Sequence, residues 1–138
     1  MPTKFNTLRI DKGERQLYEN IKSSCKELSG FENKDLFMLA LFFGYKHGSK
    51  HTLGSVESYV RLEYLNDREL GVFKAIALED SEGKAEVLLD LGQVLKTAEE
   101  YASWGVRYMS QLLGQAASFS KQFEGEVVDA ISELEMLN

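Results

Sequence analysis

The residues best suited to carry chemistry are two histidines and one cysteine. His47 and His51 are four residues apart, a spacing that lets two imidazoles on one helix face bind a metal ion. Gly48 lies between them and is typical of the end of a helix, so the two side chains are not expected to share a face. Cys25, the single cysteine, falls on an apolar stripe and is expected to be a small core residue. We therefore predict neither catalytic residues nor metal ligands.

Three further motifs resemble binding sites without completing one. Residues 48–52, GSKHT, look like a phosphate-binding loop, but they lack the Walker spacing and follow a predicted helix. Glu99 and Glu100 are adjacent, so on a helix they point about 100° apart and cannot act as a facing pair. We expect a solvated or ion-paired face there. Three aromatic residues at helical spacing could stack on bases, although core packing is the favoured interpretation: Tyr101, Trp104 and Tyr108. No cofactor is predicted.

The charge of the chain is unevenly distributed. Its 138 residues suit one compact domain, and 43% hydrophobic with 28% charged residues is ordinary for a globular protein. The net charge is -6, but residues 1–52 carry nine Lys and Arg against six Asp and Glu, which gives +3. Residues 53–138 carry seven against sixteen, which gives -9. This asymmetry indicates either a polyanion-facing end and a protein-facing end, or an acidic solvated surface.

The N-terminal residues and the cysteine count indicate the compartment. Residues 1–11, MPTKFNTLRID, lack the apolar segment of a secretory signal, and no stretch resembles a transmembrane span. A single cysteine cannot form an internal disulfide, which favours a reducing setting. We expect a cytoplasmic protein without a membrane partner.

Residues 33–47, NKDLFMLALFFGYKH, hold the only apolar run without a polar break, from Leu36 to Phe43. A helix that is apolar on every side must be covered on every side. The run is about half of the ~20 residues needed to cross a bilayer. Asn33 is expected to cap this helix, and Gly48 suits the position after its end. The sequence therefore predicts a central core helix.

The segments before this helix follow the order strand, helix, turn, helix. Residues 4–10, KFNTLRI, alternate enough for a short strand. Residues 12–28 have the apolar spacing of a helix that Asp11 would cap, and Glu14, three residues later, completes the spacing of a capping box. This order looks like that of ribbon-helix-helix proteins, in which two chains pair their strands into a ribbon that enters the major groove of DNA. Four residues would then bind DNA: Thr7 and Arg9 at the bases, Asn33 and Lys34 at the phosphates. A strand that merely covers the core is the alternative.

The middle of the chain carries the longest regular pattern. Residues 58–65, SYVRLEYL, fit a strand or the start of a helix equally, and residues 67–78 predict a helix capped by Asn66. From Leu88 to Leu112, apolar and small residues recur at spacings of three and four, which is a heptad seam in one long helix or in a short helix followed by a longer one. The small middle of the seam would admit another helix, so we predict that it binds a partner through Ala98, Ala102, Gly105 and Met109.

A last amphipathic helix is expected over residues 119–137. Its opposite side is mostly acidic, and its apolar side would consist of Phe123, Val127, Ile131 and Leu134. Packing on its own domain is favoured over docking on a partner. We thus predict a mainly α fold, with a helical domain over residues 1–114 that has a short N-terminal strand and a ribbon-helix-helix-like start. An acidic amphipathic extension follows over residues 115–138.

Three stretches resemble a known family. They are residues 31–48, FENKDLFMLALFFGYKHG, residues 72–78, VFKAIAL, and residues 96–113, KTAEEYASWGVRYMSQLL. Together they are similar to the small Dnd system-associated proteins, which are encoded beside the genes for DNA phosphorothioate modification and its linked restriction. The resemblance covers residues 5–113 and includes no catalytic signature. It implies a role beside the proteins that install or police sulfur in the DNA backbone.

We therefore expect a non-catalytic accessory protein of a DNA phosphorothioate modification and restriction system. The basic half would bind DNA and the acidic half would bind sister proteins of the system. Two alternatives remain open, a protein-only interaction module and a ribbon-helix-helix transcriptional regulator or antitoxin. A homo-oligomer is expected in each case, because the central helix and the seam present more apolar surface than one small domain readily covers.

Overall fold

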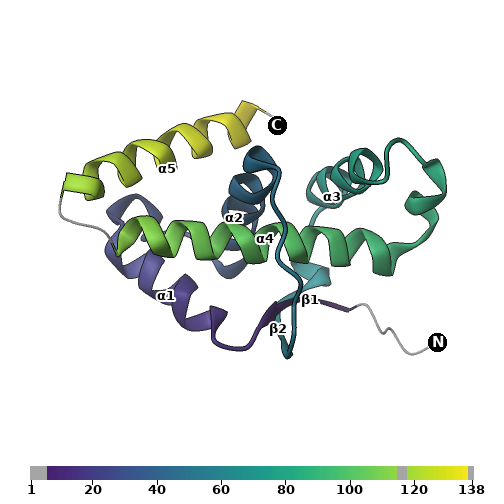
Figure 1. Ribbon diagram of the computed structural model, residues 1–138, viewed down its shortest axis with the longest axis horizontal. Helices are drawn as coiled ribbons and strands as arrows, with labels where there is room; N and C mark the ends of the chain where they lie inside the picture. Colours follow the sequence, from purple (N-terminus) through teal and green to yellow (C-terminus); the bar gives the residue numbers. More distant parts are fainter. Residues whose placement is uncertain (1–5, 115–117, 137–138) are drawn as a thin grey trace.

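The structure, a computed structural model, describes residues 6–114 and 118–136 (Figure 1). In this part of the chain there are five α-helices and a two-stranded antiparallel sheet, which confirms the predicted mainly α fold. The elements in chain order are β1 (Thr7–Asp11), α1 (Glu14–Ser24), α2 (Asn33–His47), β2 (Val56–Arg61), α3 (Asp67–Asp80), α4 (Leu91–Leu113) and α5 (Ser118–Met136). Short 3-10 helices cover Lys26–Leu28, Leu62–Tyr64 and Ala85–Leu89.

The central helix α2 begins and ends where the sequence predicts. Its cap differs from the prediction, because the N-cap residue is Glu32 and Asn33 is the first helical residue. The Asp35 carboxylate accepts a hydrogen bond from the Glu32 N–H at 2.9 Å, which satisfies a donor ahead of the first turn. At the other end, Gly48 has a φ of 64°, the left-handed conformation that ends many helices.

Two glycines let α2 and α4 cross with their backbones almost in contact. Gly44 of α2 faces the backbone of Tyr101, and Gly105 of α4 faces the backbone of Ala40. A Cβ atom on either glycine would overlap the opposite carbonyl oxygen. Any side chain at these two positions would therefore push the helices apart.

The heptad seam is used within the chain. Four residues that were predicted to bind a partner are buried in the core: Ala98, Ala102, Gly105 and Met109. The seam does not extend back to Leu88, which lies in the preceding 3-10 helix, and Gly92 falls in the first turn of α4 without interrupting it. In this fold the seam is therefore not a surface that a partner can reach.

The segment between α2 and β2, residues 48–55, crosses over α4, and Figure 1 shows it passing in front of that helix. The backbone N–H of His51 donates to the carbonyl oxygen of Glu100 at 3.0 Å and fastens the crossing. β2 then pairs with β1, with a bulge between Leu8 and Arg9. The stretch that fitted a strand or a helix equally is therefore a strand that ends in a 3-10 turn.

The N-terminal order of strand, helix, turn and helix is present, with two corrections. The predicted long first helix stops at Ser24, and a 3-10 turn follows Cys25. Asp11 does not cap α1, because it is the last residue of β1 and Gly13, with a φ of 96°, holds the N-cap position. One of the two hydrogen bonds of a capping box still forms, because Glu14 Oε1 accepts a hydrogen bond from the Asp11 N–H at 3.1 Å.

The later helices follow the predicted capping and packing. The Asn66 side chain accepts a hydrogen bond from the Glu69 N–H at 2.8 Å, and the Glu69 carboxylate accepts one from the Asn66 N–H at 2.9 Å. α5 packs on α2 and α4 and buries Val127 and Ala130. The side chain of Phe123 and residues 115–117, where the expected extension begins, lie outside the described part of the chain.

The apolar surface that motivated the predicted homo-oligomer is covered within one chain. Phe37, Leu39 and Ala40 of α2 are fully buried, as are Ala98, Ala102 and Met109 in the middle of the seam. The homo-oligomer therefore stays a prediction, but uncovered apolar surface on α2 and in the middle of the seam no longer supports it. Among the described residues, no helix has the combination of length and apolar character that spanning a membrane requires.

We predict that Gly105→Ala destabilises the protein strongly. The added methyl group cannot fit beside the Ala40 carbonyl, so overpacking should lower the free energy of unfolding by about 3 kcal/mol. Gly71→Ala is the matched control, because its methyl group meets open space on α3, and it should raise stability by up to about 1 kcal/mol. Urea denaturation measures both variants, and equal effects would contradict the close crossing.

Candidate functional site

The two strand residues predicted to contact DNA bases already have partners in the chain. Thr7 Oγ1 lies 3.0 Å from Ser58 Oγ on β2. Arg9 binds the Glu99 carboxylate of α4 through its backbone N–H at 2.7 Å and through its guanidinium, with Nη2 3.3 Å from Oε1. Glu99 therefore covers the edge of β1 that β2 leaves open. The Arg9 side chain still keeps 47% of its surface exposed.

The two phosphate-binding candidates lie at the start of α2. Asn33 and Lys34 line a polar hollow of about 670 Å³, which β2 also lines through Arg61. Lys34 Nζ donates to the Tyr64 carbonyl oxygen at 3.1 Å and pairs with Glu69 Oε1 at 3.3 Å. Thr7 is the register partner of Arg61, so β2 connects this hollow to the strand that carries Thr7 and Arg9.

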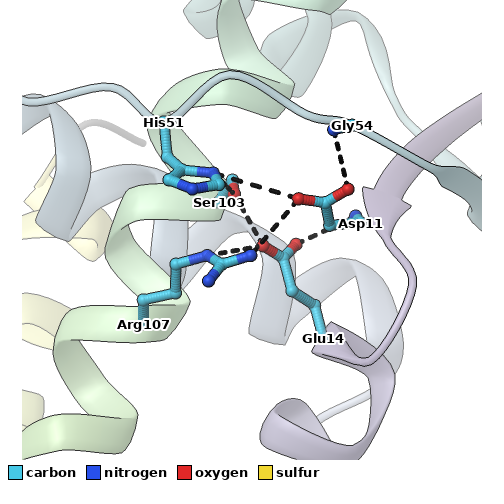
Figure 2. Close-up of polar contacts among 6 residues, drawn as sticks. All are labelled: Asp11, Glu14, His51, Gly54, Ser103 and Arg107. Carbon is cyan, nitrogen blue, oxygen red and sulfur yellow. Dashed lines mark hydrogen bonds and ion pairs between the residues drawn. The ribbon is translucent and has the colours of Figure 1, made fainter.

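A polar cluster joins β1, α1, the crossing segment and α4 (Figure 2). Glu14 is only 1% exposed, and its Oε2 accepts hydrogen bonds from the Ser103 hydroxyl at 2.6 Å and from Arg107 Nε at 3.0 Å. Because the single hydroxyl hydrogen of Ser103 points to Glu14, its oxygen accepts from the Nδ1–H of His51, which is 3.1 Å away. The crossing segment is thereby tied to α4 and α1.

The second carboxylate of this cluster is equally well satisfied. Asp11 Oδ1 accepts a hydrogen bond from the Gly54 N–H at 2.9 Å, and Oδ2 accepts one from Arg107 Nη2 at 3.2 Å. His51 Nδ1 lies 4.0 Å from the same Oδ2. One guanidinium thus bridges two carboxylates from neighbouring elements.

Three members of the cluster could also hold a cation. Asp11, Glu14 and His51 each offer a ligand atom, and these atoms lie within 4.8 Å of one another. However, Arg107 lies against both carboxylates, and all four carboxylate oxygens accept hydrogen bonds from the chain. The guanidinium supplies the positive charge that a metal ion would bring, so the donor set fits a buried ion pair better than a metal centre.

Glu99 forms a second ion pair of α4, two turns before Arg107, in which only the carboxylate is buried. It is 3% exposed, and burial raises the pKa of its carboxyl group while the hydrogen bonds from Arg9 act in the opposite direction. The sequence suggested a solvated or ion-paired face for Glu99 and Glu100. The structure makes Glu99 ion-paired and buried.

The aromatic residues of α4 pack on other rings, as the favoured interpretation expected. Trp104 and Tyr108 stack with ring centroids 5.2 Å apart, and the His47 ring lies 4.5 Å from Tyr108. Tyr101 is buried and donates its hydroxyl to Asp80 at 2.9 Å. Burial and this hydrogen bond raise the pKa of Tyr101 to about 12. His47 and His51 therefore lie in different environments, one in an aromatic stack and one in the polar cluster.

Two apolar hollows of about 380 and 430 Å³ adjoin each other between α2, α3 and α5. Both are lined by Met38 of α2, Val72 of α3 and Leu134 of α5, so they form one surface feature, which we name the α2–α3–α5 groove. Leu41 and Ile76 lie deeper in the first hollow and are buried. Among the described residues, none covers this apolar groove.

Comparison with known families assigns the chain to a group. The family model for DNA sulphur modification system-associated protein 4 matches residues 7–133. The chain belongs to this family. The resemblance expected from the three sequence stretches is thus confirmed, and the match extends into α5. Neither the curated proteins nor the solved structures contain a match to the chain.

In this member of the DNA sulphur modification system-associated family, sequence reasoning missed the polar cluster. The sequence pattern indicates Asp11 and Glu14 only as a capping-box spacing and gives Arg107 no role. The available signal was a glutamate three residues after an aspartate at a strand end, together with one arginine inside the apolar pattern of α4. Neither signal says that the two segments meet, because about ninety residues separate them.

We predict that Arg107→Met destabilises the protein because it leaves two neighbouring carboxylates without a cation. The loss should lower the free energy of unfolding by about 2 kcal/mol, less than for a fully buried pair because the Arg107 side chain is 43% exposed. The double variant Glu14→Gln/Arg107→Met should recover part of that loss, since the most enclosed carboxylate is then neutral. Urea denaturation tests both, and a double variant less stable than Arg107→Met would contradict the ion-pair account.

We also predict a pH dependence that Glu99 causes. Its folded-state pKa is raised, so its contribution to stability is fully present below the unfolded pKa, about 4.3, and is lost as the pH rises through the folded pKa. The free energy of unfolding of the unmodified protein, relative to Glu99→Gln, should therefore fall as the pH rises from about 4 to about 7. This range begins near the unfolded pKa and extends above it, because the folded pKa is higher. A relative stability that rises over this range would mean that attraction to Arg9 outweighs burial.

Proposed function

We propose that this protein is a non-catalytic accessory protein of a DNA sulphur modification system and acts by binding a sister protein of that system. Membership of a system-associated family supports the setting. The observation that carries the choice of a protein partner is the internal pairing of Arg9 and Lys34, the two cations predicted to contact DNA. Arg9 pairs with Glu99, Arg15 with Glu57 and Lys34 with Glu69, in a chain whose net charge is -6.

The surface instead offers a binding partner exposed apolar side chains. The α2–α3–α5 groove exposes aliphatic carbon from three helices in one place. Grooves of this kind are typical binding sites for protein segments. A second apolar group lies at the end of the 3-10 helix before α4 and at the first residue of α4. Leu89 is 92% exposed, and Leu88 and Leu91 are more than one third exposed. Both features favour contact with protein over contact with a polyanion.

DNA binding is the second candidate, and one observation favours it. β2 lies between the strand that carries Thr7 and Arg9 and the hollow lined by Asn33 and Lys34. Arg61 of β2 also lines this hollow, and its side chain is 67% exposed. A polar hollow with these side chains and the N-terminus of α2 is compatible with a phosphate backbone. Each cation there must leave or share a carboxylate partner before it can neutralise a phosphate, which weakens this candidate.

The ribbon-helix-helix regulator has less support. In such dimers the strand of one chain pairs with the strand of the other, which requires an edge with open hydrogen-bonding groups. β1 pairs with β2 of its own chain, and on its other edge the Arg9 N–H donates to Glu99. A ribbon between two chains would have to break one of these contacts.

Affinity purification from cells separates the two main candidates. We expect the tagged protein to retain a sister protein of the DNA sulphur modification system both before and after nuclease digestion. Retention that disappears with nuclease would contradict the protein-contact proposal and favour DNA.

Duplex binding at increasing salt is the complementary measurement. If DNA were the ligand, affinity would fall with salt, and Lys34→Ala and Arg61→Ala would each lower the salt slope by about one unit. Arg61→Ala is the cleaner variant, because Arg61 pairs only with exposed Glu63 and its loss strands no buried carboxylate. We expect weak binding that neither variant changes.

A further inference from the structure

We propose that the α2–α3–α5 groove binds a basic amphipathic helix of a partner protein. This inference rests on the proposed function, since it names the kind of segment that a sister protein would present. It depends on three properties of the groove: an apolar floor, two adjoining hollows and an acidic rim.

The floor offers contacts to aliphatic side chains. Met38, Phe42 and Val72 are partly buried and face the first hollow, and Leu134 closes it from α5. Methionine and leucine provide an adaptable apolar surface that suits the leucine-like side chains of a helix. Ala75 of α3 is exposed at this hollow, so its small size keeps the floor open.

The two hollows suit a helix better than an extended strand. They adjoin through three shared residues, and each has the volume to take one or two apolar side chains. An amphipathic helix presents such side chains in pairs spaced by one or two turns. An extended strand would instead need an open backbone edge. The groove is lined mainly by three helices, whose interior backbone groups are paired, together with Gly30 and Phe31 of the turn before α2.

The rim determines the sign of the partner's charge. Glu79 and Glu133 flank the first hollow, and three carboxylates and one guanidinium surround the second: Asp35, Glu69, Glu135 and Arg68. Two lysines pair with rim carboxylates, Lys46 with Glu133 Oε1 at 3.7 Å and Lys34 with Glu69 Oε1 at 3.3 Å. Five carboxylates against these two lysines and one guanidinium still leave the rim with a net negative charge. Lysine and arginine residues beside the apolar stripe of a partner helix would complement this rim, and acidic residues would be repelled.

A second copy of the chain fits this groove poorly. An acidic surface of a chain with a net charge of -6 repels its own copies. The exposed leucines Leu88, Leu89 and Leu91, a second apolar group on the surface, have Glu86 and Asp90 as sequence neighbours. The groove therefore favours a partner of opposite charge over self-association.

Two synthetic peptides test the proposal on the full chain. One is a helical peptide of about 18 residues, or five turns, with leucine on one face and lysine on the other, and the second carries glutamate in place of lysine. We expect the lysine peptide to bind saturably in a one-to-one complex, measured by fluorescence anisotropy at physiological salt. The glutamate peptide should bind at least about tenfold more weakly.

Three variants locate the binding site. Glu79→Lys/Glu133→Lys reverses the charge of two rim residues and should weaken binding of the lysine peptide by at least about tenfold. Glu19→Lys/Glu86→Lys is the matched control, because it changes the net charge equally at exposed sites away from the groove. It should leave binding unchanged. Ala75→Glu adds an acidic group to the floor. It should also weaken binding, because an extended carboxylate fills the hollow, whereas purely electrostatic attraction would make the complex tighter.

Several results would overturn the proposal. These are the absence of saturable binding, equal losses in the two charge-reversed double variants, tighter binding by Ala75→Glu, or a dimer that Ala75→Glu dissociates. If the peptide fails while the sister protein is still retained after nuclease digestion, only the groove assignment is lost. If retention itself fails, the proposed function is lost independently of the peptide result.

Discussion

The fold depends on the close crossing of α2 and α4. Gly44 and Gly105 remove the two side chains that would hold the helix backbones apart, so that each backbone rests against a carbonyl of the other helix. A central helix that is apolar on nearly every side needs cover on nearly every side, and this crossing provides the largest part of it. The long helix α4 thereby becomes the element on which the others are placed.

The polar contacts are arranged around the other faces of α4. Glu99 and Arg107 lie two turns apart, and each forms an ion pair with β1 or with the residue that ends it. The crossing segment adds the hydrogen bonds of His51. Buried ion pairs contribute little net stability when complete, but they penalise every arrangement that leaves a charge unpaired. They therefore specify how the N-terminal elements dock on α4, while the surface between α2, α3 and α5 stays available.

Local patterns predicted the fold well. The bounds of α2, the capping box at Asn66 and the apolar side of α5 follow from residue types within a few positions of each other. The site could not be predicted in the same way. Arg9 looks like a cation for DNA until Glu99, ninety residues later, is found beside it, and the small seam of α4 looks like a partner surface until α2 is found near it. Which surfaces remain open is decided by tertiary contacts that single-sequence patterns do not contain.

The central claim is that one chain covers its own apolar helices, so that the seam of α4 is internal. Hydrogen exchange measured by mass spectrometry over a dilution series tests it most directly. The account predicts that the amides of Ala98, Ala102 and Met109 exchange among the slowest in the protein and that their rates do not change on dilution from micromolar to nanomolar concentration. Exchange in this stretch that becomes fast on dilution would show that a second chain protects the seam, and would contradict the account.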